Sequence, residues 1–178
     1  LTVALVTILT TNCSNDDDNV NTGWVALPLN DGNLEEATSK TSSKTISITS
    51  SESYDYNNDG NASTDIKNQM AYCQFDDDFG FYVTTAGSKG YSYYFKTKCN
   101  STEPNSIIRE QYTIETDNVW LFNFKPDDTN TNAEEFVLRN VQLFSRTANK
   151  IYTLYRIEYD LLDKTTGKTF HWVREQSL

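Results

Sequence analysis

The sequence predicts an all-β protein built as an antiparallel, eight-stranded meander barrel, with a β-sandwich as the alternative. Three observations predict this class. Apolar and aromatic residues alternate with polar ones at a period of two over much of the chain after Tyr72, clusters of turn residues separate these runs, and few apolar patterns have the period and length of a core helix. A meander is favoured because short turns join neighbouring strands from Val119 onward.

The N-terminal half contains fewer strands. Residues 23–27 are the first strand candidate, and the polar stretch Asn30–Ser43 is predicted to be a long loop. Ile46 and Ile48 alternate with Ser and Thr in the next strand. An Asn, Asp and Gly segment at 55–65 and a short helical turn around 66–72 follow.

The C-terminal half is predicted to be a series of strands and tight turns. Strands are expected at Tyr91–Phe95, Val119–Phe124, Phe136–Phe144, Tyr155–Leu161 and Thr169–Arg174. The segment Asp163–Lys168 contains Thr166 and Gly167 and predicts a hairpin turn between the last two strands.

The N-terminal residues have the pattern of a lipoprotein signal. The uncharged run Leu1–Leu9 precedes Cys13 and the acidic cluster Asp16–Asp18. We expect residues 1–12 to belong to a signal peptide, 13–22 to form a lipidated acidic tether and 23–178 to fold as one domain. The alternative is a buried strand over residues 2–10 with Cys13 as a free thiol.

The N-terminal pattern resembles the lipoprotein signal peptides of the Bacteroidetes group. The resemblance rests on the order Cys13, Ser14, Asn15 and three Asp residues. It implies an outer-membrane protein that is exposed at the cell surface and held by acyl chains on Cys13, since two or more chains anchor a protein stably.

Composition and charge narrow the functional classes. The formal net charge is −10, the pI is about 4.5, and the fifteen Lys and Arg residues form no runs. Nucleic acid is therefore not expected as a partner, because binding phosphates needs clustered cations. The single His and the lack of nucleophile-elbow or phosphate-loop motifs argue against an enzyme. We expect a monomeric binding protein.

Cysteine usage predicts a disulfide. If Cys13 is lipidated, Cys73 and Cys99 remain as an even pair in an exported chain, where disulfides persist. A metal site on these two thiolates lacks companions, because His171 is the single histidine and no Cys-x-x-Cys occurs. His171 itself is expected at the surface or rim of its strand.

Residues 55–65 contain half of a calcium-binding loop. Asp55, Asn57 and Asp59 occupy alternate positions before Gly60, as in the first half of an EF-hand loop. Calcium is therefore a candidate cofactor, with these ligands: Asp55, Asn57, Asp59, Asn61 through its carbonyl, Ser63 and Asp65. The alternative is a turn in which the side chains bind their own backbone, because the twelfth position is Ile66 and not an acid.

Aromatic residues make up 13% of the chain and are candidates for a ligand site. The densest cluster, Tyr91–Phe95, predicts a strand with aromatic side chains on both faces. The ligand-lining candidates are Tyr91, Tyr93, Phe95, Trp120, Tyr155, Tyr159 and Trp172. The alternative for each ring is an ordinary place in a β-protein core.

The segment from Asp55 to Cys99 resembles lipocalin-like lipoproteins of flavobacteria. The resemblance rests on the Asp- and Asn-rich run at 55–66, on Cys73 through Asp77, on Lys98 and Cys99, and on Gly23 and Trp24 at the first strand. It implies an eight-stranded calyx-type barrel, a Cys73–Cys99 bridge and binding without catalysis.

Two functions follow as expectations. The first is a lipid-anchored protein, facing either the cell exterior or the periplasm, whose barrel holds a small hydrophobic or amphipathic ligand. The second is a sandwich module that binds glycans or a partner protein in a nutrient-uptake or adhesion assembly. An internal cavity would favour the first, and a filled core would favour the second.

Overall fold

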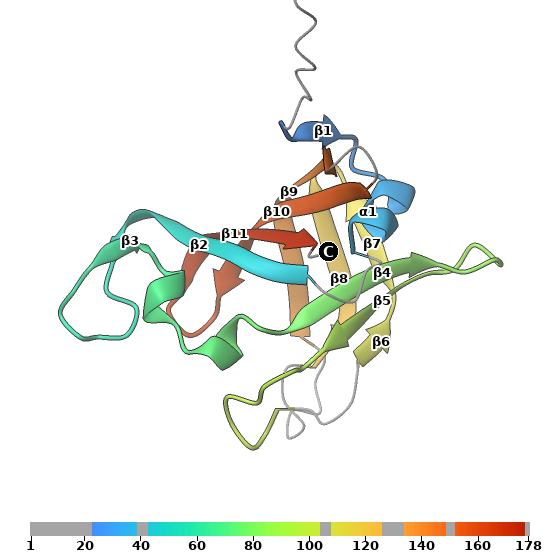
Figure 1. Ribbon diagram of the computed structural model, residues 1–178. Helices are drawn as coiled ribbons and strands as arrows, with labels where there is room; N and C mark the ends of the chain where they lie inside the picture. The colour runs from blue at the N-terminus through green and yellow to red at the C-terminus, as the bar shows by residue number, and fades with distance from the viewer. Residues whose placement is uncertain (1–22, 39–42, 104–107, 126–133, 149–151, 177–178) are drawn as a thin grey trace, which may run out of the picture.

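The structure is a computed structural model that describes residues 23–38, 43–103, 108–125, 134–148 and 152–176. It confirms the all-β antiparallel class (Figure 1). The strands of the first half are β1 (Val25–Leu27), β2 (Ser43–Tyr54), β3 (Ser63–Asp65), β4 (Asp78–Val83) and β5 (Lys89–Tyr94). Those of the second half are β6 (Ile108–Glu110), β7 (Tyr112–Glu115), β8 (Asn118–Phe124), β9 (Glu134–Ala148), β10 (Tyr152–Asp163) and β11 (Lys168–Gln176).

The described strands form two antiparallel sheets. The large sheet has the order β3-β2-β11-β10-β9-β8-β7, and β1 pairs with the part of β9 that β8 leaves free. Strands β7 to β11 are neighbours in chain order, which confirms the predicted meander in this half. The small sheet is β4-β5-β6, and the ladders of the described strands do not join into one ring.

The small sheet packs with one face against the large sheet. Phe79 of β4 contacts Tyr159 of β10 edge to face at 5.7 Å between ring centroids, and Tyr93 of β5 contacts Phe124 of β8 at 5.1 Å. Edge-to-face pairs of this kind add to the stability gained from burial alone. Residues of both sheets therefore share one core, which has the layering of the sandwich alternative.

The polar stretch after β1 contains a helix, so the predicted long loop at residues 30–43 is wrong. Helix α1 spans Asp31–Thr38 and buries Leu34, Ala37 and Thr38. The Asn30 side chain accepts a hydrogen bond from the Asn33 amide at 2.9 Å, as an N-cap does. The helical signal in this stretch is weak because only Leu34 and Ala37 form the apolar face, and their burial depends on contacts with β4, β9 and β10.

Two shorter predictions are confirmed. The 3-10 helix η1 (Lys67–Gln69) lies within the predicted helical turn, and a second, η2 (Tyr72–Gln74), follows it. Asp163 pairs with Lys168 at the end of β10 and β11, and the Asp163 carboxylate accepts hydrogen bonds from the amides of Thr165 and Thr166.

The predicted disulfide between Cys73 and Cys99 is confirmed, with the two Cα atoms 5.3 Å apart. It joins η2 to the segment that follows β5 and so closes a loop around the β4–β5 hairpin. Residues 1–22, with Cys13 and the tether, lie outside the described part of the chain. Within that part, no helix has the length and apolar character needed to cross a membrane.

Replacing both cysteines, Cys73→Ser with Cys99→Ser, is expected to lower the free energy of unfolding by about 3 kcal/mol, because the bridge restricts the unfolded chain over this loop. Urea unfolding of the variant and of the oxidised protein measures the difference. A reductant should bring the unmodified protein to the stability of the variant and leave the variant unchanged. Equal stabilities with and without the bridge would contradict the prediction.

Candidate functional site

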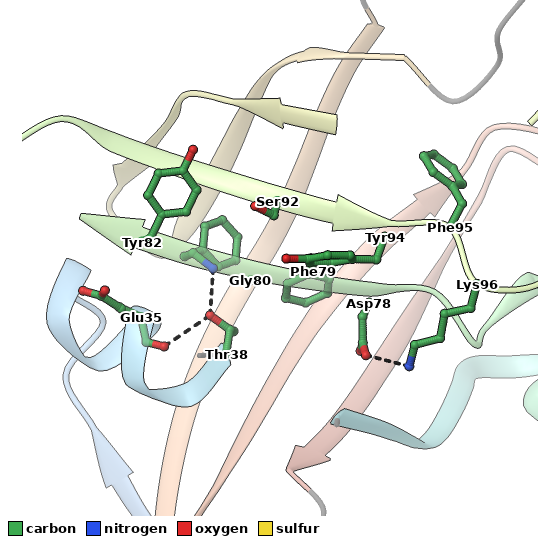
Figure 2. A pocket seen from close by; sticks show the side chains of 11 residues that line it. Glu35, Thr38, Asp78, Phe79, Gly80, Tyr82, Ser92, Tyr94, Phe95 and Lys96 are labelled. Carbon is green, nitrogen blue, oxygen red and sulfur yellow. Dashed lines mark hydrogen bonds and ion pairs between the residues drawn. The ribbon is translucent and has the colours of Figure 1, made fainter. Parts of the chain in front are cut away.

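A cleft of about 440 Å³ lies between α1 and the β4–β5 hairpin. This volume is in the range of small-molecule sites. Figure 2 shows α1 along one side and the two strands along the other. The lining residues are Glu35, Thr38, Asp78, Phe79, Gly80, Phe81, Tyr82, Ser92, Tyr94, Phe95 and Lys96.

Small residues form the middle of the cleft. Gly80 and Ser92 are cross-strand partners, and their neighbours Phe79, Phe81 and Tyr91 turn to the core. The end of α1 lies close to this pair, because the Thr38 hydroxyl accepts a hydrogen bond from the Phe81 amide at 2.9 Å. A Cβ on Gly80 would lie 3.3 Å from the Thr38 carbonyl oxygen. The absence of a side chain at Gly80 therefore allows α1 and β4 to lie close to each other.

The ring of Tyr82 lies on the backbone of its cross-strand partner Gly90. A Cβ at Gly90 would come within 2.4 Å of the Tyr82 Cζ atom, so no larger residue fits under the ring. Tyr82 is half-buried and lines the cleft. The ring is thus supported on one face by backbone.

A charged network closes one end of the cleft. Asp78 accepts a hydrogen bond from Arg174 of β11 at 2.5 Å, and the two side chains are 9% and 5% exposed. The Ser43 hydroxyl of β2 binds the same carboxylate, and the Lys96 ammonium lies 2.6 Å from its other oxygen. Two cations therefore flank the one carboxylate at this end.

Asp77 precedes Asp78 in the chain and links the start of β4 to β5 and to the residues that follow β5. Its carboxylate accepts hydrogen bonds from the Lys96 amide at 3.0 Å and from the Tyr93 hydroxyl at 3.4 Å. Burial raises the pKa of Asp77 from 3.8 to about 6, and the nearby carboxylates of Asp76 and Glu103 act in the same direction.

The predicted ligand residues lie mainly in the core. Tyr91, Tyr159 and Trp172 are buried in the shared core, and Tyr93 packs against it. Trp120 and Tyr155 are half-buried on β8 and β10. Phe95 lines the cleft. Beside Tyr93, Tyr159 and Trp172 the structure has a cavity of about 30 Å³, room for one or two water molecules.

The loop predicted to bind calcium binds its own backbone. The Asp55 carboxylate accepts hydrogen bonds from the amides of Asp59 and Gly60 at 3.1 and 2.8 Å, and Asp59 accepts from the Asn61 amide at 2.8 Å. The hydrogen bond from the Asn61 amide lowers the pKa of the Asp59 carboxyl. Among the described residues no group of three His, Cys, Asp or Glu side chains is placed to hold a metal.

The remaining candidate ligands of this loop are also engaged locally. The Ser63 hydroxyl accepts a hydrogen bond from the Asp65 amide at 3.0 Å, and the Asp65 carboxylate accepts from the Asn68 side chain at 2.7 Å. The Asn57 side chain bonds to Asp59. Calcium binding by Asp55, Asn57, Asp59, Asn61, Ser63 and Asp65 stays a prediction.

Most cleft residues were absent from the sequence-based candidates. Tyr94 was not a candidate, although the aromatic cluster at 91–95 contained a signal for it, because aromatics on both faces of a strand put one on the side away from the core. Glu35 and Thr38 were missed together with α1. No sequence motif marks Gly80, Ser92 or Gly90. They shape the cleft because of their cross-strand pairs, Gly80 with Ser92 and Gly90 with Tyr82.

Comparisons with profiles of protein families, with curated proteins and with solved structures gave no match. The resemblance to lipocalin-like lipoproteins therefore stays a prediction, and the residues of the cleft are the basis for function.

The variant Asp77→Asn is expected to be more stable than the unmodified protein at pH 7.5, and this advantage should shrink at pH 4.5. A raised pKa means that the folded state takes up a proton between about pH 4 and pH 6, so folding stability falls as the pH rises through that window. The asparagine keeps an acceptor for the Lys96 amide without the charge.

Urea midpoints at the two pH values measure this effect. Glu52→Gln is the control, since it removes one carboxylate from an exposed position of β2. The same advantage at both pH values, or a loss of stability at pH 7.5, would contradict the assigned cause.

Proposed function

We propose that the protein is a non-catalytic binding protein that holds a small amphipathic ligand in the cleft between α1 and the β4–β5 hairpin. The observation behind this proposal is the composition of a cleft of about 440 Å³, where aromatic rings adjoin a few charged and hydroxyl groups. Ligand sites in proteins have this makeup.

The packing of the core supports a site outside the large sheet. A ligand inside a barrel would have to lie where aromatic rings now stack on one another. The ring centroids of Phe124 and Phe136 are 4.2 Å apart, and those of Tyr159 and Trp172 are 6.1 Å apart. The neighbouring cavity of about 30 Å³ is too small for an organic ligand. Both observations support a ligand site on the outer face of the small sheet.

The residues around the cleft suit binding better than catalysis. The lining contains no His or Cys. Of its carboxylates, Asp78 is bound by Arg174 and Lys96 and so is not free to transfer a proton. His171 lies on β11 between Asp160 and Glu158, at 2.9 and 3.4 Å, and is not among the lining residues.

The proposal includes the location of the protein. Acyl chains on Cys13 hold the domain at the outer membrane, facing the cell exterior, and residues 14–22 separate the domain from the lipid. Support comes from the apolar run, the cysteine and the acidic cluster of the sequence. The acidic surface itself would not adsorb to anionic lipid, since the net charge is −10.

Binding of the amphipathic dye 8-anilinonaphthalene-1-sulfonate tests the proposal. The dye should bind the folded protein saturably, with fluorescence that rises on binding, because its rings suit the aromatic lining and its sulfonate suits Lys96. Ser92→Phe should lower the affinity by roughly tenfold or more, because the new ring fills the middle of the cleft, a loss of about 1.4 kcal/mol.

Ser51→Phe is the matched control, since Ser51 is exposed on β2 and is not among the residues that line the cleft. Circular dichroism of both variants verifies that they fold. Equal dye affinity for Ser92→Phe, Ser51→Phe and the unmodified protein would show that the cleft is not the site.

A further inference from the structure

Tyr82 forms a flat platform at one end of the cleft. Its ring rests on the Gly90 backbone, with the Cζ, hydroxyl and Cε2 atoms all within 2.7 Å of where a Cβ would stand. The lower face of the ring is therefore covered by the strand. The opposite face borders the cleft, where Figure 2 shows no lining side chain stacked on it.

A second tyrosine lies further along the same face. Tyr94 pairs with Asp78, whereas Tyr82 pairs with Gly90, so the Gly80–Ser92 pair separates the two tyrosines. The two pairs are four residues apart along β4, which corresponds to about 14 Å. Figure 2 shows the small residues between the rings. The cleft therefore offers two aromatic surfaces, with a stretch of small side chains between them.

The polar groups of the cleft are mixed in kind and balanced in charge. Glu35 supplies an acceptor beside the Tyr82 end, and Lys96 supplies donors at the Tyr94 end (Figure 2). The two carboxylates, Glu35 and Asp78, are matched in number by two cations, because Lys96 and Arg174 both pair with Asp78. A ligand that fits must both donate and accept hydrogen bonds and needs no net charge.

From these features, and resting on the proposed function, we infer that the ligand is a neutral oligosaccharide. A pyranose ring has an apolar C–H face that packs on an aromatic ring and hydroxyl groups that donate and accept. The spacing of the tyrosines suits a short chain of linked rings better than one sugar. A long acyl chain would need an enclosed apolar cavity, and a polyanionic glycan would be repelled by a net charge of −10.

An array of neutral and charged oligosaccharides, probed with the full chain, tests the inference. The protein should bind neutral members, and calorimetry should then give an affinity for the strongest of them. Tyr82→Ala should lower this affinity by roughly tenfold, a loss of about 1.4 kcal/mol. Gly90→Ala should do the same although it replaces none of the lining residues, because the new Cβ displaces the flexible Tyr82 ring.

Matched controls are Tyr72→Ala and Gly32→Ala. Tyr72 is 67% exposed and is not among the lining residues, and a Cβ at Gly32 would make only ordinary contact, 3.6 Å from Asn30 Oδ1. Neither should change the affinity. Neutral glycan binding that survives both Tyr82→Ala and Gly90→Ala would overturn the inference, since the platform would then have no part in it.

The dye experiment separates the proposed function, binding in the cleft, from the inference that the ligand is a neutral oligosaccharide. If the dye binds and Ser92→Phe blocks it, but the array shows no neutral oligosaccharide or only charged ones, the oligosaccharide inference fails and the proposed function stands. If neither the dye nor any glycan binds at the cleft, both fail.

Discussion

The buried ion pair between Asp78 and Arg174 joins the small sheet to the large sheet. Asp78 begins β4 of the small sheet, and Arg174 lies on β11 in the large sheet. Ser43 at the start of β2 binds both side chains. Removing two charges from water costs several kcal/mol per ion, so such a pair adds little net stability and instead fixes the geometry of its surroundings. Here it fixes the small sheet against the large one.

The position of the cleft follows from this attachment. Asp78 is held at the core on one side and meets Lys96 at the cleft on the other. The Cys73–Cys99 bridge closes the loop around the same hairpin, and Thr38 joins α1 to Phe81. Three separate contacts thus fix the hairpin and helix that line the cleft. A site formed by a short helix and a two-stranded ribbon needs such support, because neither element has a large core of its own.

The sequence predicted those features that depend on local pattern. Strands from Val119 onward have a period of two and clear turns, and Cys73 and Cys99 were the pair left once Cys13 is assigned to lipid. The alternation of Phe170, Trp172 and Arg174 also puts the arginine on the core face of β11. Its partner Asp78 is 96 residues away, so no local pattern could identify it. Helix α1 and the Gly80–Ser92 pair likewise depend on contacts between distant segments.

A double-mutant cycle on Asp78 and Arg174 tests whether this ion pair fixes the small sheet against the large sheet. Urea unfolding would be measured for Asp78→Asn, Arg174→Met and the double variant. The ion pair predicts that Asp78→Asn costs about 3–5 kcal/mol, because it leaves a buried guanidinium without its carboxylate, and that the double variant loses clearly less than the sum of the single losses. Losses that simply add would show that the two side chains act independently and that this ion pair does not fix the small sheet against the large one.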